Sequence, residues 1–326
     1  MSTQPTPTST PYSGQFLRYA QLTVTGGVGG LDISEQRFRF EVRASDSETP
    51  NSLVCRVYNL SRDTEKEIIK EFDQVTLTCG YQNGNKALIF QGTIKQFRRG
   101  KERNVDSYLD ILAADGDVAY NFGTVNKTIP AGATRLQELG VYADQMDLPI
   151  SQSTVKLLSG DNQLLSGGVN VNISSKLAFG MGRDYVRLLA EESDCRWSVQ
   201  NGKLIFIPNS GYLPGDIVDI NSATGMLGTP ESTDAGIKVR CYLNPLITIG
   251  RLIHLNNADI NQTIFPSSNK SQLGVGYNDQ CLPATTSDDG YYRVLVAEHV
   301  GDTRGNDWYT ELTCLVVDIS SGQIGG

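Results

Sequence analysis

Residues 59–116 read NLSRDTEKEIIKEFDQVTLTCGYQNGNKALIFQGTIKQFRRGKERNVDSYLDILAADG, and they say more about the fold than any other stretch. A short helix is predicted after Asn59 and Leu60, because the Ser61 side chain can accept hydrogen bonds from the free N–H groups of the first turn. The apolar stripe of this helix consists of Ile68, Ile69 and Phe72. The helix is short, so we expect it to cover an opening rather than to span a domain.

Two alternating runs follow the helix. Val75, Leu77 and Cys79 alternate with threonines, and a turn containing Asn83 and Gly84 leads to the next run, so a hairpin is predicted. The connection to the last strand of the stretch is basic, with Arg98, Arg99, Lys101 and Arg103. These side chains could bind an acidic partner or a phosphate, but a solvated hairpin tip is the favoured interpretation.

The sequence before this stretch is also strand-rich. Phe38, Phe40 and Val42 alternate with charged residues and predict a half-buried strand, and the run that ends at Val57 predicts another. The glycines between Gly26 and Gly30 predict a turn; no Gly-Lys-Ser or Gly-Lys-Thr follows them, so a phosphate loop is not expected.

After Tyr120 the pattern changes to a mixture of helices and strands. Helices are predicted over Ala133–Met146 and Asp184–Ser193, an exposed loop over Ser159–Ser175, and a hairpin where Asn201 and Gly202 separate two strand-like runs. Strand patterns then return, with a long polar connection at Asn257–Asp289. The later strands are predicted near Ile217 and Ile220 and over Gly236–Leu243, Leu246–Leu255, Tyr291–His299 and Trp308–Val317.

Composition is that of a β-rich soluble protein without a basic surface. The 326 residues carry a formal charge of −8, which argues against nonspecific binding of nucleic acid through a basic surface. Neither a signal peptide nor a membrane-spanning window is recognised. The six cysteines lack metal or redox spacing, and Cys55, Cys79, Cys241 and Cys314 lie in apolar strand patterns, where reduced thiols act as small core side chains.

The order of these motifs resembles the baseplate hub proteins of long-tailed bacteriophages and the related hub portion of secretion-system spike proteins. The residues that carry the resemblance are the Asn59–Gly116 stretch, the helix and hairpin from Tyr185 to Pro208, the Gly228-Thr229-Pro230 lead into Ile237, and Tyr292–Thr313 with His299 and Gly301-Asp302. The resemblance implies a mainly β fold, in which two tube-type β-barrel domains flank a small α/β domain. The implied boundaries are a flexible N-terminus at 1–14, a first barrel at 15–119, the α/β domain at 120–215 and a second barrel at 216–326.

The function that the resemblance implies is structural. Three subunits with two barrels each form a pseudo-six-fold ring that joins the tail tube to the central spike, and its lumen passes the tape-measure protein and DNA. The implied partners are a homotrimer of the chain itself, the tube or tube-initiator protein, the spike, and the tape-measure and wedge proteins, in a virion baseplate assembled in the host cytoplasm. Membrane insertion is not expected. The tail is expected to be contractile, and negative charge would discourage retention of DNA in transit.

Two other functions stay open. The main alternative is a receptor- or carbohydrate-binding β protein of the tail tip, in which Trp197 and Trp308 would stack on a sugar, although core packing is the favoured role for both. A glycan-degrading enzyme comes third. Catalytic, cofactor-binding and metal residues are not predicted. The candidates that are set aside as structural are His254 and His299, and the Asp-Gly turns at Asp115, Gly116 and Asp117 and at Asp288, Asp289 and Gly290.

Overall fold

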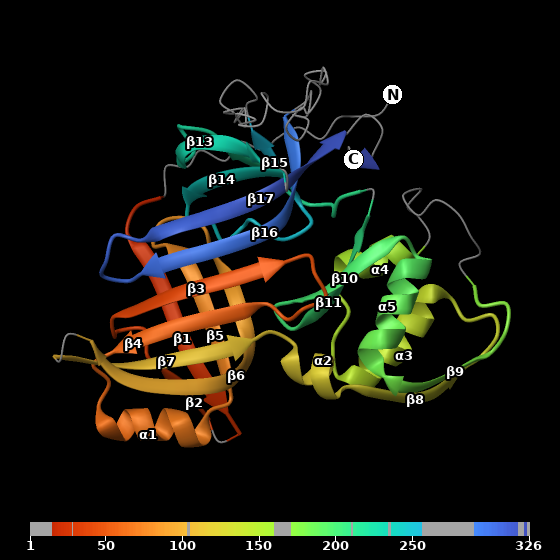
Figure 1. Ribbon diagram of the computed structural model, residues 1–326, viewed down its shortest axis with the longest axis horizontal. Helices are drawn as coiled ribbons and strands as arrows, with labels where there is room; N and C mark the ends of the chain where they lie inside the picture. Colours follow the sequence, from red (N-terminus) through yellow and green to blue (C-terminus); the bar gives the residue numbers. More distant parts are fainter. Residues whose placement is uncertain are drawn as a thin grey trace, which may run out of the picture.

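A large sheet with a smaller helical unit at its side makes up the protein (Figure 1). The computed structural model describes residues 15–27, 29–102, 105–159, 171–209, 211–233, 236–255, 290–318 and 323–324. The helices among these residues are α1 (Arg62–Glu71), α2 (Asp117–Phe122), α3 (Arg135–Met146), α4 (Gln152–Leu158) and α5 (Gly182–Glu192). Within this part of the chain, none of them has the length and apolar character needed to cross a membrane.

The first strand unit curls around its own core. Its strands are β1 (Arg18–Gly26), β2 (Gly29–Asp32), β3 (Phe38–Ser45), β4 (Ser52–Tyr58), β5 (Gln74–Tyr81), β6 (Lys86–Glu102) and β7 (Asp106–Ala114). They follow the order β3-β4-β7-β6-β5-β1-β2, and β3, β4 and β7 cross in front of β1 and β5 (Figure 1). Apolar side chains from both layers fill the space between them.

The predictions for this unit are confirmed, with one correction. In β3 every second residue from Phe38 to Val42 is buried, and α1 begins with the Ser61 hydroxyl accepting from the Thr64 N–H at 3.1 Å. The basic residues, however, do not form a connection. Strand β6 continues to Glu102 against β7, so Arg98, Arg99 and Lys101 are part of a long hairpin, while Arg103 falls outside the described residues.

The small α/β unit contains the helices α2 to α5 and two ribbons. The ribbons are formed by β8 (Thr124–Ile129) with β9 (Lys176–Met181), and by β10 (Cys195–Gln200) with β11 (Lys203–Pro208). The predicted Asn201-Gly202 turn is confirmed: both residues have positive φ, 52° and 72°, as a two-residue type I′ turn requires. Both predicted helices are present as α3 and α5. Residues 160–170 of the predicted loop lie outside the described part of the chain.

The second strand unit continues the sheet of the first. Its strands are β12 (Val218–Ile220), β13 (Met226–Thr233), β14 (Gly236–Tyr242), β15 (Leu252–Leu255), β16 (Tyr291–Asp302), β17 (Trp308–Asp318) and β18 (Gln323–Ile324). Strand β16 pairs with β3 from Val296–Ser45 to Asp302–Arg39, which makes one sheet of both units. The mainly β fold with an α+β insertion is therefore confirmed. The direct pairing of the two strand units through β3 and β16 was not predicted.

One predicted strand of this unit is wrong over half of its length. Leu246–Leu255 forms a strand only from Leu252 onward, and the residues before it form turns. Pro245 cannot donate to a ladder, and Gly250 adopts a φ of +79°, so the chain cannot stay extended there. The predicted connection at Asn257–Asp289 lies outside the described residues.

Candidate functional site

The loop between β3 and β4 holds the α/β unit against the sheet. Asn51, which is buried in this loop, donates through Nδ2 to the Val199 carbonyl and to Gln200 Oε1, both at 2.9 Å. Gln200 in turn donates through Nε2 to the Ser45 carbonyl at 2.8 Å. These bonds tie both ends of the loop to strand β10, because Ser45 ends β3 and Asn51 precedes β4.

Two carboxylates of the same loop face arginines from other parts of the chain. Asp46 Oδ2 lies 3.1 Å from Arg196 Nη1 and 3.8 Å from Arg293 Nη2, and Glu48 Oε2 lies 2.7 Å from Arg187 Nη2. The Asp46 and Arg293 side chains are 9% and 1% exposed, whereas Glu48 and Arg187 are about one-third exposed. Solvent therefore screens the Asp46–Arg293 pair poorly, whereas Arg196, at 53%, and the Glu48–Arg187 pair are open to solvent.

Arg293 also joins three segments that are distant in sequence. From strand β16 its Nη1 donates to the carbonyls of Pro208 at 2.7 Å and Gly211 at 3.0 Å. Burial lowers the pKa of this guanidinium to about 10, and nearby Asp46 opposes that shift. The cation thus links the end of β11, the second strand unit and the β3–β4 loop. We call the contacts of Asp46, Glu48, Asn51, Arg187, Arg196, Gln200 and Arg293 the clamp.

Asp115 adds a buried acceptor beside the clamp. Its Oδ1 accepts from the Gly202 N–H at 2.8 Å, across the turn of the β10–β11 hairpin. Burial raises the pKa of this carboxyl to about 6, and hydrogen bonds from the backbone N–H groups of Gly202 and Asn201 oppose the rise. The neighbouring Gly116 has a φ of +69°, so the predicted Asp-Gly turn is confirmed.

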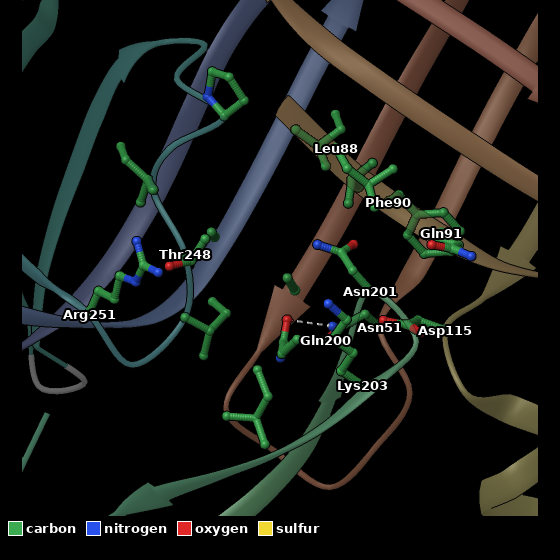
Figure 2. A pocket seen from close by; sticks show the side chains of 18 of the residues that line it. Asn51, Leu88, Phe90, Gln91, Asp115, Gln200, Asn201, Lys203, Thr248 and Arg251 are labelled. Carbon is green, nitrogen blue, oxygen red and sulfur yellow. Dashed lines mark hydrogen bonds between the residues drawn. The ribbon is translucent and has the colours of Figure 1, made fainter. Parts of the chain in front are cut away.

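A cavity of about 350 Å³ lies where the three units meet. Figure 2 shows that polar side chains from the β10–β11 hairpin and the β3–β4 loop face Leu88 and Phe90 of β6, with Thr248 and Arg251 on the opposite wall. Apolar residues supply much of the remaining lining. The cavity therefore lies between the α/β hairpin and the sheet, and the clamp residues Asn51 and Gln200 form part of its wall.

The titratable groups described at this junction are poorly suited to acid-base catalysis. His299 lines the cavity, but burial lowers its pKa to about 4, and its Nδ1 lies 2.9 Å from Thr310 Oγ1. It is therefore neutral at physiological pH. Within the described residues, no group of three His, Cys, Asp or Glu side chains could hold a metal ion. Cys195 and Cys241 are buried thiols whose pKa burial raises to about 12.

His254 has a partner that sequence spacing did not reveal. The parallel pairing of β12 with β15 places Asp219 opposite His254, and the Nδ1 of the histidine lies 2.6 Å from Asp219 Oδ1. The Tyr291 ring lies beside the imidazole, with centroids 4.9 Å apart. Both histidines lie in strands, as expected. The two residues are 35 positions apart, so this pair could be predicted only by knowing how β12 and β15 are aligned.

The other candidate residues that the structure describes lie in cores, ion pairs or turns. Trp197 packs in the core of the α/β unit, and Trp308 packs edge-on against Phe40 in the core of the first strand unit. Asp117 begins α2 and pairs with Lys95. Gly26 and Gly29 face each other across the β1–β2 turn. Asp288 and Asp289 lie outside the described residues.

The basic residues of β6 stay apart from the junction. Arg99 pairs with Glu65 of α1 at 3.0 Å, and Arg98 donates to Gln96 at 3.1 Å in the same strand. Both arginines are exposed, and one of their bonds joins two solvent-facing side chains. This arrangement fits the solvated hairpin interpretation better than a preorganised phosphate site.

Solved structures share this architecture. The 43 kDa tail protein of prophage MuSo2 from Shewanella oneidensis is similar over 90% of this chain and 97% of its own, with 7% identity and a TM-score of 0.53. A tail protein from Neisseria meningitidis covers 92% of this chain and 96% of its own, with 8% identity and a TM-score of 0.53. The chain has the fold of phage tail proteins. No family model and no curated protein matches it.

The similarity extends to a secretion machine. A component of the Escherichia coli type VI secretion system, described as structurally similar to the bacteriophage T4 tail proteins gp27 and gp5, matches 89% of this chain and 75% of its own. The identity is 9% and the TM-score 0.50. The resemblance to tail hubs and to secretion spike proteins, first based on short motifs, is therefore confirmed at the level of the fold.

Proposed function

We propose that the chain is a structural baseplate hub of a phage tail. Three copies form a pseudo-six-fold ring that joins the tail tube to the central spike and surrounds the lumen used by the tape-measure protein and DNA. The chain is a virion component, assembled in the host cytoplasm, and acts without catalysis. The observation that carries this proposal is the fold, which two phage tail proteins share over nine-tenths of the chain.

The sheet gives this function a physical basis. Because β3 and β16 pair directly, each subunit would bring two strand units with a fixed relative orientation to the ring. Three such pairs make six similar positions, which is what a six-fold tube requires. The domain boundaries that belong to this proposal are 15–119, 120–215 and 216–326, and buried apolar residues fall into clusters that largely follow them.

The alternative of a sugar-binding tail-tip protein has less support. Trp197 and Trp308 are 1% and 4% exposed, so neither ring offers a face to a sugar. A glycan-degrading enzyme would need two carboxyl groups across an open cleft, whereas Asp115 is buried against a hairpin turn. Structural assembly explains the same residues without an exposed site.

The proposal is tested on the purified full chain. Native mass spectrometry should give three times the monomer mass, and electron microscopy should show a ring that binds the tube and spike proteins of the same virus. In the assembled ring, a predominantly negative or neutral lumen would agree with passage of DNA. A monomer that ignores the tube and spike proteins, or that hydrolyses peptidoglycan, would overturn the proposal.

A further inference from the structure

The exposed large apolar side chains of the described residues include two separate groups. The first, the ribbon patch, consists of Leu177 and Phe179 of β9 with Phe122 and Ile173, which lie in sequence shortly before β8 and β9. The second, the strand patch, lies at the start of β1 and the end of β14 and consists of Phe16, Leu17, Tyr242 and Leu246. Figure 1 places the α/β unit and strands β13 and β14 on opposite sides of the molecule.

The ribbon patch follows from strand register. In β8–β9 the inner face carries Val125, Ile129 and Ala178, which pack on the helices. Leu177 and Phe179 have the opposite parity and face outward, both more than 70% exposed. Half-buried ribbons normally carry polar residues on that face, as β8 does here with Thr124, Asn126 and Thr128.

One backbone position on the edge of the same ribbon, that of Phe179, is already occupied. The Tyr185 hydroxyl lies 2.9 Å from the Phe179 nitrogen and 3.1 Å from the Phe179 oxygen, so it accepts from one backbone group and donates to the other. A partner therefore cannot pair with the backbone of Phe179 without displacing this tyrosine. The exposed side chains of the outward face can make a contact without any backbone pairing.

The strand patch is held in place from both sides. Leu17 adopts a φ of +59°, an uncommon conformation for a bulky residue, and its carbonyl accepts from the Gln82 N–H at 2.8 Å. Gln15 donates through Nε2 to the Thr224 carbonyl at 3.2 Å. Anchored on both flanks, Phe16 is nevertheless 71% exposed. The backbone thus presents an apolar residue to solvent in a fixed position.

Each patch has the size of half an interface. With roughly 150–250 Å² for a large aromatic side chain, four side chains at these exposures present on the order of 400–500 Å² of apolar surface. A standard interface buries about 800 Å² per partner, somewhat more than half of it apolar. Either patch could therefore supply the apolar centre of one side of a stable contact between subunits.

The large sheet ends at β13 on one side and at β2 on the other, and its β13 edge is a poorer contact than the patches. Edge strand β13 contains Pro230, which lacks an N–H, and its register with β14 shifts between Leu227 and Glu231. Such features block pairing with another strand. At this end of the sheet, contact through side-chain patches is therefore the better solution.

We propose that the ribbon patch of one copy docks on the strand patch of the next copy. This inference rests on the proposed function, because it names the surfaces that would close the ring. Since the two patches differ and lie on opposite sides, each contact leaves one free patch of each kind, and only a closed ring satisfies all of them. A two-fold dimer that pairs like patches would not need both.

Two substitutions test the pairing. Phe179→Asp disables the ribbon patch and Phe16→Asp disables the strand patch, while Val105→Asp, at an 82% exposed position outside both patches, is the matched control. Losing one central aromatic contact should raise the concentration at which the ring dissociates by roughly 30-fold or more. The control should assemble like the wild type. All three side chains are exposed, so circular dichroism should show unchanged folding.

Mixing the two disabled variants gives the decisive measurement. Each keeps the patch that the other lacks, so native mass spectrometry should show a one-to-one dimer and no larger ring. If both variants remain trimers, the docking proposal is wrong while the hub function stands. If one variant assembles normally and the other does not, the contact joins like patches and the head-to-tail pairing is wrong. A monomeric wild type would overturn the ring itself.

Discussion

The first strand unit has two neighbours, and it is joined to them in opposite ways. The second strand unit shares its backbone ladder through β3 and β16, and it also contributes Leu243 and Trp308 to its core. The α/β unit is held by the clamp, mostly through polar side chains around a cavity of about 350 Å³. The first joint cannot move without unfolding, whereas the second can loosen by losing a few hydrogen bonds.

A substitution in the core shared by the two strand units should cause the largest loss of stability. Trp308→Ala removes a buried ring that packs against Phe40 across the joint, and it should lower the free energy of unfolding by about 3–5 kcal/mol. Urea denaturation of the full chain measures this. In the variant Trp197 is the only tryptophan, so its fluorescence reports the α/β unit while circular dichroism reports the strands.

The urea midpoints of the circular dichroism and fluorescence transitions test whether the two joints differ in strength. The circular dichroism transition should shift to lower urea more than the fluorescence transition does, because the lost contact belongs to the strand units. Val105→Ala, at an exposed turn, should change stability by less than about 0.5 kcal/mol. Equal shifts of both signals would mean that the two joints are equally tight.

Arg293→Met tests the centre of the clamp. The substitution leaves the Pro208 and Gly211 carbonyls without this donor and removes a cation from beside Asp46, so a loss of about 3 kcal/mol is expected. Hydrogen exchange should show faster opening of β10–β11 than of β3 and β16. A loss below about 1 kcal/mol, or equal exchange in all three regions, would contradict a central role for this arginine.

Asp115 makes the α/β joint sensitive to pH. Its pKa of about 6 lies above the usual 3.8, so the folded state holds this proton more tightly, and the contribution of Asp115 to stability rises as the pH falls from 7 to 4. Asp115→Asn should remove this contribution, so the stability difference between wild type and variant should change by about 2 kcal/mol across that range. Urea denaturation at several pH values measures it.

The matched control for this pH effect is Asp147→Asn. Asp147 is exposed and has a φ of +54°, which asparagine also tolerates. It removes one carboxylate from the surface, as Asp115→Asn removes one from the interior. If both variants change stability with pH by the same amount, the carboxyl of Asp115 is not held in its neutral form by burial.

Local patterns predicted the elements of this fold well. Alternation located β3, β4, β14 and β17, the Ser61 hydroxyl caps α1 as expected, and the Asn201-Gly202 dipeptide marked its hairpin, because each of these signals depends on near neighbours in sequence. The long β6 was harder to predict: its last residues are basic on both faces and stay extended only because β7 pairs with them.

The junctions could not be predicted in the same way. Asn51 follows Pro50 in a polar loop that looks like any other, and its role depends on Val199, which lies 148 residues away. Arg293 lies in a strand where a charged residue is expected to face solvent, yet it is buried against carbonyls of another unit. Long-range burial of polar groups leaves no local pattern in sequence.

The outer pair of the clamp should give the smallest effect. Glu48 and Arg187 are each about one-third exposed, and their hydrogen bond raises the pKa of the arginine. Solvent screens such a pair, so a double-mutant cycle with Glu48→Ala and Arg187→Ala should give a coupling below about 1 kcal/mol that shrinks at high salt. The same cycle with Asp46→Ala and Arg293→Met should give a larger coupling, because these two side chains are only 9% and 1% exposed. Equal couplings would mean that solvent screens the centre of the clamp as well as its rim. The distinction between a buried central pair and a solvent-screened outer pair would then be wrong.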